Sequence, residues 1–194
     1  MSRILFITHP EVVIDPAVPI PEWPLSPVGR QRMEAFTRSP VLQGVASLHA
    51  STERKAMDGA EILGKALGLG LATDHDLGEN DRSSTGFIAP PEFWEVVEAF
   101  FARPTESIRG WERAVDAQSR IVRAVRQVAD TAVPGDAAIV AHGGVASLLM
   151  AHLRGTQDAR PFAQPRQSGG CFFVIDRETF ALAEGWSTLE NAAA

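Results

Sequence analysis

Cysteine is nearly absent from the 194-residue sequence, since Cys171 is the only one. A lone cysteine excludes a disulfide within the chain and a zinc cage of cysteines, and it is typical of a reducing compartment. No apolar run reaches the roughly 20 residues that a membrane-spanning helix needs, and the first residues lack the apolar segment of a signal peptide. We therefore expect a cytoplasmic protein that does not engage a membrane.

Positive charge is also scarce, because 18 Lys and Arg residues stand against 24 Asp and Glu residues, for a net charge of -6. This balance argues against nucleic acid as a partner. Hydrophobic residues make up 45% and charged residues 22%, which is typical of a globular protein. Without an internal repeat or an interdomain linker, the chain predicts a single domain over residues 1–194. Its state of assembly stays open, a homo-oligomer included.

Metal-binding motifs are missing too. The five histidines include no pair at the spacing of a metal site, such as His-x-His or His-Glu-x-x-His. We expect neither a metal ion nor a cofactor. His49 and His75 lie at predicted strand positions and His152 lies on a predicted helix, and none of the three is expected to act in catalysis.

Short apolar runs and helical patterns alternate along the chain. Runs typical of strands cover residues 3–9, 45–50, 71–77 and 137–141, with a closing pair at 171–175 and 180–183. Apolar residues three and four apart predict helices that begin near residues 27, 52, 91, 107 and 145. Ser26 is a good N-cap for the first of these helices, and Ser51 or Thr52 for the second. The alternation predicts an α/β fold with a mostly parallel sheet covered on both faces.

Two histidines occupy matching positions, each directly after a short apolar strand. Pro10 stops the first strand at His9, and His142 follows a later strand and precedes two glycines. If the two strands are neighbours in a parallel sheet, both imidazoles meet in the crevice beyond the strand ends. A neutral imidazole can attack a phosphoryl group, and a protonated one can neutralise its oxygens. Considered alone, each histidine is explained more simply as a polar residue that ends a strand and is hydrogen-bonded to a neighbour.

Other polar residues follow strand ends in the same way. After the second strand, Ser51 can supply a hydroxyl and Arg54 or Lys55 a cation, although the segment alone reads as an ordinary capped helix with a solvated basic turn. Glu79 opens a polar loop over residues 78–90. A carboxyl that is shielded from water beside a phosphate can act as a general acid, whereas most loop glutamates are exposed and idle. Arg82 follows in the same loop and can form an ion pair with Asp81.

In their order along the chain, these motifs resemble the histidine phosphatase superfamily, in its phosphoglycerate mutase-like branch 1. The likeness rests on a strand before His9-x-Glu11, on Leu25-Ser26-x-x-Gly29, Ser51-x-x-x-Lys55-Ala56-x-x-x-Ala60 and Leu77-x-Glu79, and on Ala141-His142-Gly143-Gly144. It covers almost the whole chain, and the ordered set is specific where no single motif is. The resemblance implies a three-layer α/β/α sandwich, a phosphohistidine on His9, phosphate binding by His142, an acidic proton donor at Glu79, and no metal.

The sequence departs from the family pattern around the first histidine. The family signature is Arg-His-Gly, whereas this chain has Thr8-His9-Pro10, so one phosphate-binding arginine is missing. The family's second arginine falls on Lys55, with Arg54 beside it. Lysine offers a point charge where arginine offers a bidentate fork, so this exchange is not neutral. Arg82 is our candidate for a replacement cation, because it is close to Glu79 in the sequence.

We expect a metal-independent hydrolase that acts on a small phosphate monoester. In this hypothesis His9 attacks the phosphorus and Glu79 protonates the leaving oxygen. The phosphate-binding set comprises Lys55 or Arg54, Ser51, Thr8, Arg82, His142 and the N–H of Gly143. Hydrolysis is favoured over mutase action because the segment after Glu79 is modest for a lid that must exclude water. The alternative, favoured by the missing arginine, is a catalytically weakened relative that binds phospho-ligands or acts as an interaction protein.

Overall fold

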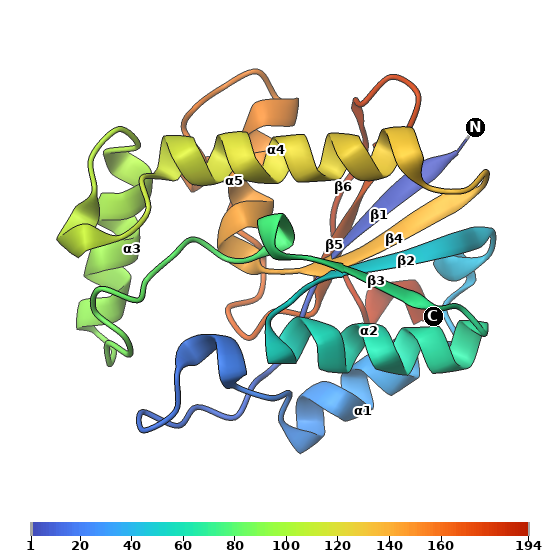
Figure 1. Cartoon of the computed structure of the whole chain (residues 1–194), viewed down its shortest axis with the longest axis horizontal. Helices are drawn as coiled ribbons and strands as arrows, with labels where there is room; N and C mark the ends of the chain where they lie inside the picture. The colour runs from blue at the N-terminus through green and yellow to red at the C-terminus, as the bar shows by residue number, and fades with distance from the viewer. Residues whose placement is uncertain (1, 194) are drawn as a thin grey trace.

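The computed structural model describes residues 2–193, and a six-stranded sheet runs through its centre (Figure 1). The strands are β1 (Arg3–Thr8), β2 (Val45–Ser51), β3 (Leu71–Asp74), β4 (Asp136–Ala141), β5 (Cys171–Asp176) and β6 (Leu182–Thr188). Their order across the sheet is β3-β2-β4-β1-β5-β6. The first four in this order are parallel, whereas β5 runs antiparallel to β1 and forms an antiparallel pair with β6. The predicted α/β class with a mostly parallel sheet is confirmed.

Helices cover both faces of the sheet, as Figure 1 shows. They are α1 (Pro27–Phe36), α2 (Arg54–Leu67), α3 (Glu92–Ala102), α4 (Ala114–Thr131) and α5 (Gly143–Leu153). Alternate side chains of β1 enter opposite cores, since Leu5 and Ile7 pack beneath α1 and α2 while Ile4 and Phe6 pack against α4 and α5. The result is the three-layer α/β/α arrangement.

The start of α1 is fixed by two neighbouring contacts. The Ser26 hydroxyl accepts a hydrogen bond from the N–H of Gly29 at 3.0 Å, which confirms the predicted N-cap. Gly29 is buried against the backbone of the preceding loop, and a Cβ at this position would lie 2.2 Å from the carbonyl oxygen of Glu11. Only glycine allows so close an approach, so the loop that follows β1 is held against the first helix.

Two predicted helix starts are wrong. The N-cap of α2 is Glu53 in an extended conformation, not Ser51 or Thr52, because Ser51 still belongs to β2. α4 begins at Ala114 rather than near residue 107, because Arg109 adopts a left-handed conformation with a φ of 52°.

Two further predictions near strand ends need correction. His75 lies in a 3-10 turn after β3 and not in a strand. The last strand begins at Leu182, later than residue 180, because Phe180 has a φ of 55° and still belongs to the turn that Asp176 holds through the N–H groups at 178 and 179.

The sheet brings the two histidine-bearing strand ends together. Thr8 of β1 is paired with Ala141 of β4, and the N–H of His9 donates to the Ala141 carbonyl oxygen at 3.0 Å. Because the two strands are parallel neighbours, the residues that follow them, His9 and His142, leave the sheet side by side. The condition for the two imidazoles to meet, that their strands are neighbours in a parallel sheet, is therefore met.

Candidate active site

His9 and His142 face each other at the C-terminal edge of the sheet. Their rings meet edge to face, with 5.2 Å between centroids and an interplanar angle of 68°. His142 is fully buried and His9 is partly buried. Two imidazoles at this separation can contact one small group between or beside them.

The hydrogen bonding of His9 leaves one ring nitrogen unused. Its Nδ1 lies 2.8 Å from the carbonyl oxygen of Pro10, an atom that only accepts, so Nδ1 carries the proton and Nε2 has the lone pair. Burial, helped by the charge of Lys55, lowers the pKa of His9 to about 4. The imidazole is therefore neutral near pH 7, as a nucleophile must be.

The backbone of His9 is held by the loop before β5. The N–H of Gly170 donates to the His9 carbonyl oxygen at 3.1 Å. Gly169 has a φ of 67°, and a Cβ there would lie 2.0 Å from the same oxygen. Both the positive φ and the close approach to the His9 carbonyl oxygen require glycine at position 169.

His142 is tied to the end of β2 through its Nε2 atom. The Ser51 hydroxyl lies 2.8 Å from Nε2, and the Oε1 atom of Glu53 lies 3.4 Å from it. The Nδ1 atom is buried and has no hydrogen-bond partner among residues 2–193. Burial lowers the pKa of His142 well below its usual value, although the Glu53 carboxylate opposes that shift.

Two basic residues, Arg54 and Lys55, follow β2, and Lys55 is the one whose side chain turns toward the histidines. It is 3% exposed, and its ammonium donates to the Ile20 carbonyl oxygen at 2.8 Å and to the Glu53 carboxylate at 2.5 Å. Burial lowers the pKa of Lys55, with Glu53 partly offsetting the shift. Burial alone would raise the pKa of Glu53, but His142 and Lys55 beside it hold that pKa well below its usual range.

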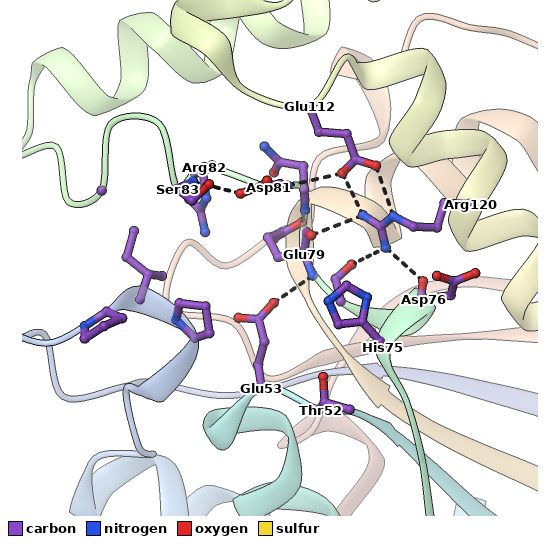
Figure 2. Close-up of a pocket in the computed structure, with 16 residues that line it drawn as sticks. Thr52, Glu53, His75, Asp76, Glu79, Asp81, Arg82, Ser83, Glu112 and Arg120 are labelled. Carbon is purple, nitrogen blue, oxygen red and sulfur yellow. Dashed lines mark hydrogen bonds and ion pairs between the residues drawn. The ribbon is translucent and has the colours of Figure 1, made fainter.

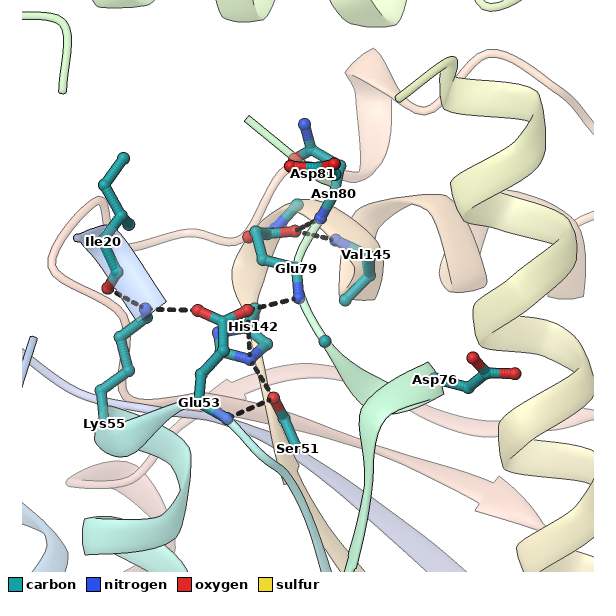
Figure 3. Close-up of polar contacts among 12 residues, drawn as sticks. Ile20, Ser51, Glu53, Lys55, Asp76, Glu79, Asn80, Asp81, His142 and Val145 are labelled. Atoms are coloured by element: carbon teal, nitrogen blue, oxygen red, sulfur yellow. Dashed lines mark hydrogen bonds and ion pairs between the residues drawn. The ribbon is translucent and has the colours of Figure 1, made fainter. Parts of the chain in front are cut away.

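Glu79 reaches across to the first turn of α5, as Figure 3 shows. Its carboxylate accepts hydrogen bonds from the N–H groups of Gly144 and Val145, both at 2.9 Å. Its own N–H donates to Glu53 Oε1 at 2.8 Å. The helix dipole and the free N–H groups favour a negative charge at this point, so Glu79 occupies a position that suits an anion.

Arg120 of α4 fixes the backbone around Glu79 (Figure 2). Its guanidinium donates to the carbonyl oxygens of Asp76, Gly78 and Glu79 at 2.8, 2.9 and 3.1 Å. It also forms two hydrogen bonds with the Glu112 carboxylate, at 3.0 and 2.8 Å. Five bonds from one side chain hold the start of the 78–90 loop in a single conformation.

Arg82 contributes a further cation. Its guanidinium lies 5.6 Å from the ring centroids of both Phe93 and Trp111. Within residues 2–193 it forms no ion pair, so the predicted pair with Asp81 is wrong. Asp81 instead accepts from the N–H of Ser83 at 2.8 Å. The Arg82 charge is nonetheless one of the causes that lower the pKa values of both histidines.

A cavity of about 880 Å³ opens beside this cluster. Its lining includes Ile20, Glu53, Glu79, Asp81, Arg82 and Arg120, several of which are labelled in Figure 2. His9 and His142 lie outside its wall, whereas Glu53, which lies 3.4 Å from His142, and Glu79, which bonds to Glu53, form part of it. The volume suits a small organic molecule.

Two residues expected at the site are directed elsewhere. The Thr8 hydroxyl is buried and bonds the backbone of Cys171, donating to its carbonyl oxygen at 3.2 Å and accepting from its N–H at 3.1 Å. Arg54 is mostly exposed and pairs with Asp58 at 2.8 Å. Gly143 is the first residue of α5, and a Cβ there would lie 2.4 Å from Gln164 Nε2.

Sequence reasoning missed two residues of this cluster, Glu53 and Arg120. The signal for Glu53 was a carboxylate two positions before Lys55, directly after a strand. Arg120 gave no local signal, because it looked like one of several polar residues on the outer face of a long helix. Within the described part of the chain, no three His, Cys, Asp or Glu side chains are arranged to hold a metal ion, and no helix is long and apolar enough to cross a membrane.

Solved structures share this fold over nearly their whole length. A mycobacterial glucosyl-3-phosphoglycerate phosphatase in complex with inorganic phosphate has 19% identity and a TM-score of 0.80, with 98% of this chain and 99% of that chain covered. YhfR of Bacillus stearothermophilus has 22% identity and a TM-score of 0.76, with 95% and 96% covered. The alpha-ribazole phosphatase of Shigella flexneri has 20% identity and a TM-score of 0.71, with 96% of each chain covered. No curated protein gives a significant match.

The family itself is shown by the sequence. Residues 18–181 match the family model of the histidine phosphatase superfamily, branch 1. The matched range holds Lys55, Glu79 and His142, and it begins beyond the divergent Thr8-His9-Pro10 segment. Together with the shared fold, this match means that the chain belongs to branch 1 of the histidine phosphatase superfamily.

Proposed function

We propose that this protein hydrolyses a small phosphate monoester through a phosphohistidine intermediate on Nε2 of His9, without a metal ion. The observation that carries the proposal is the 2.8 Å hydrogen bond from His9 Nδ1 to the Pro10 carbonyl oxygen, which leaves the Nε2 lone pair free. The chain belongs to the histidine phosphatase superfamily, and two of its structural neighbours are phosphatases. Both facts support the proposal. The low pKa of His9, about 4, supports it further, because the nucleophile is neutral at neutral pH.

The first step forms the bond from Nε2 of His9 to phosphorus and breaks the phosphorus–oxygen bond of the ester. Glu79, which the phosphoryl group displaces from the α5 N-terminus, is the general acid and gives a proton to the leaving oxygen. Its carboxylate then takes a proton from the water that attacks the phosphohistidine, and phosphate is released. The charge on the transferring group is met by Lys55, Arg82 and His142, with the Ser51 hydroxyl and the Gly143 N–H nearby.

The substrate needs space for an organic leaving group, and the cavity of about 880 Å³ provides it. Two structural neighbours are named as a glucosyl-3-phosphoglycerate phosphatase and an alpha-ribazole phosphatase, which supports hydrolysis over mutase action. A small phosphorylated molecule is the partner that we propose, with no part for nucleic acid or membrane. We also propose a cytoplasmic location, because the single free cysteine of the chain is typical of a reducing compartment.

The test is hydrolysis of an aryl phosphate between pH 5 and 8 in the presence of a chelator. We expect turnover by the native protein and a loss of about three orders of magnitude or more in His9→Ala. The matched control is His152→Ala, which removes an exposed histidine of α5 and leaves turnover unchanged. An acid-labile phosphoryl group on the native protein, absent from His9→Ala, identifies the intermediate. Equal turnover in the native protein and His9→Ala contradicts the mechanism.

A second function, binding of phospho-ligands without turnover, is favoured by one specific observation. Where the family signature has an arginine, the Thr8 hydroxyl bonds to the backbone of Cys171 and supplies no cation to stabilise a transition state. A binding protein of this kind would be stabilised by phosphate and yet hydrolyse no ester. A screen of phosphate monoesters that yields thermal stabilisation but no released phosphate would establish it.

A further inference from the structure

Glu53 lies against three residues of the site, Lys55, Glu79 and His142. No single step of the proposed hydrolysis requires all three contacts. One carboxylate oxygen accepts from Lys55, and the other accepts from the N–H of Glu79 at 2.8 Å. This second oxygen also lies 3.4 Å from Nε2 of His142. Figure 3 shows Glu53 between these three residues, with Ser51 below it. The residue therefore faces the second histidine with a full negative charge.

The contacts of His142 determine where its proton lies when the ring is neutral. The Ser51 hydroxyl can either donate to Nε2 or accept from it, so this contact alone does not decide. The Glu53 carboxylate can only accept, and it lies next to the same nitrogen. A proton on Nε2 satisfies both neighbours, which leaves a bare lone pair on Nδ1. Nδ1 is buried and has no partner among residues 2–193.

A bare Nδ1 lone pair repels a phosphate oxygen unless a proton lies between them. A phosphate monoester in its singly charged form carries such a proton, because its second pKa is about 6. Transfer of this proton to Nδ1 gives an imidazolium and a doubly charged phosphoryl group, and the total charge is unchanged. The N–H so formed on Nδ1 then donates to the phosphoryl oxygen, while the Nε2 N–H continues to face Ser51 and Glu53.

We propose that Glu53 is a positioning residue that fixes the proton of neutral His142 on Nε2 and stabilises the imidazolium formed when Nδ1 takes the proton of a bound phosphate monoanion. The inference rests on the proposed function for its substrate class, a phosphate monoester. It goes beyond that function by assigning a task to a carboxylate that touches neither the phosphorus nor the leaving oxygen.

The charges around His142 make this task necessary. The groups around the ring come from three other parts of the chain: His9 after β1, Ser51, Glu53 and Lys55 at the β2–α2 junction, and Arg82 in the 78–90 loop. Burial opposes a positive charge on His142, and so do the charges of Lys55 and Arg82. Glu53 is the main cause that favours it. Without Glu53 the imidazolium would lie in a buried site near Lys55 and Arg82, with no carboxylate at its Nε2 side to balance its charge.

The experiment first measures the tautomer of His142 in the native protein. The full chain is labelled with ¹⁵N-histidine, and NMR reports which nitrogen of His142 carries the proton, with His142→Gln used to assign the signals. We expect the Nε2–H tautomer in the free protein at pH 7. Addition of inorganic phosphate should convert the signals to those of an imidazolium protonated on both nitrogens.

The variant Glu53→Gln removes the charge and keeps the size of the side chain. We expect its affinity for inorganic phosphate to fall about 10- to 100-fold, the range for loss of one charge-assisted hydrogen bond. Phosphate binding requires protonated His142, so it declines as the pH rises through the pKa of His142 in the complex. Because Glu53 raises that pKa, the decline should occur at lower pH in Glu53→Gln than in the native protein.

Two controls separate positioning from general effects. Glu61→Gln makes the same exchange at an exposed position of α2 and should leave phosphate affinity and its pH profile unchanged. Glu53→Asp keeps the charge and should restore part of the affinity, and it provides a second reading where Glu53→Gln folds poorly.

Three results would overturn the inference: a free His142 protonated on Nδ1, a phosphate complex in which His142 stays neutral, or a Glu53→Gln protein that binds phosphate as well as the native protein or better. The last would mean that Glu53 only competes with phosphate for Lys55. Ester hydrolysis is measured separately on the same samples. Phosphate binding with the expected His142 signals but no hydrolysis would refute the proposed function and leave the task of Glu53 standing.

Discussion

The Glu79 carboxylate accepts a hydrogen bond of 2.9 Å from the N–H of Gly144, at the first turn of α5. A Cβ on Gly144 would lie 2.6 Å from Glu79 Oε1, so the absence of a side chain at position 144 is what admits the carboxylate. The residue proposed as the proton donor thus rests where a phosphate oxygen would otherwise bind. A phosphoryl group bound at this point would displace the carboxylate, and under the proposed function the displaced carboxyl protonates the leaving oxygen.

Removal of Glu79 should therefore change binding and turnover in opposite directions. In Glu79→Ala we expect inorganic phosphate to bind more tightly, since a competing anion is gone from the α5 N-terminus. Hydrolysis should fall by about two to four orders of magnitude because the general acid is lost. Calorimetric titration with phosphate and an ester hydrolysis assay measure the two effects. Weaker phosphate binding in Glu79→Ala would contradict the competition.

The neighbouring residues Arg54 and Lys55 should respond very differently to the same substitution. Lys55→Met leaves the Glu53 carboxylate without its buried ammonium partner, so we expect a loss of about 3 kcal/mol or more in unfolding free energy and a large loss of phosphate affinity. Arg54→Met removes an exposed guanidinium from the buried Asp58 carboxylate, which keeps Arg30 as a partner, and should leave phosphate affinity unchanged. Denaturant unfolding and phosphate titration of both variants check this. Equal effects on affinity would mean that Arg54 also reaches the phosphate.

Arg120 and Arg123 form a second matched pair, on the same helix. Arg120→Met removes the five bonds to Glu112 and to the backbone around Glu79, so we expect about 3 to 5 kcal/mol of destabilisation and reduced turnover. Arg123→Met removes an exposed contact with Asp76 and should cost less than about 1 kcal/mol. Urea unfolding gives both values. A small effect of Arg120→Met would show that the loop holds its conformation without the guanidinium.

The stability of the protein should decrease in mild acid because of its buried neutral histidines. The pKa of His9 is lowered by burial from 6.5 to about 4 in the folded state, so between these values the unfolded chain binds the extra proton. The contribution of neutral His9 to the free energy of unfolding is fully present above pH 6.5. About 3 kcal/mol of it is lost as the pH falls toward 4. Unfolding experiments across this range should show a shallower slope for His9→Gln than for the native protein. Identical slopes would mean that His9 titrates normally when folded.

Much of the fold could be predicted from the sequence because its signals are local. Short apolar runs, prolines and glycines predicted the strands, and the two strand-end histidines needed only one further fact, that β1 and β4 are neighbours. The start of α4 was missed because a left-handed Arg109 cannot be recognised from apolar spacing.

The missed parts of the site depend on contacts between distant segments. Glu79 bonds to the start of α5, and Arg120 bonds to backbone carbonyl groups of another loop. Neither contact produces a periodic pattern of residues in the sequence of the two segments that it joins. Glu53 was within reach of sequence reasoning, but its role depends on the extended conformation that carries it past Ser51 to His142.

The paired hydrogen bonds between Thr8 and Cys171 make the loss of the family arginine hard to reverse. The Thr8 hydroxyl satisfies both the N–H and the carbonyl oxygen of Cys171 in a fully packed environment. An arginine at this position would leave both groups unpaired and would need space that the packing around β5 has closed. A single back-substitution would therefore damage the sheet before it could restore a phosphate ligand. A further cation is therefore easier to introduce at other positions, such as the loop that carries Arg82.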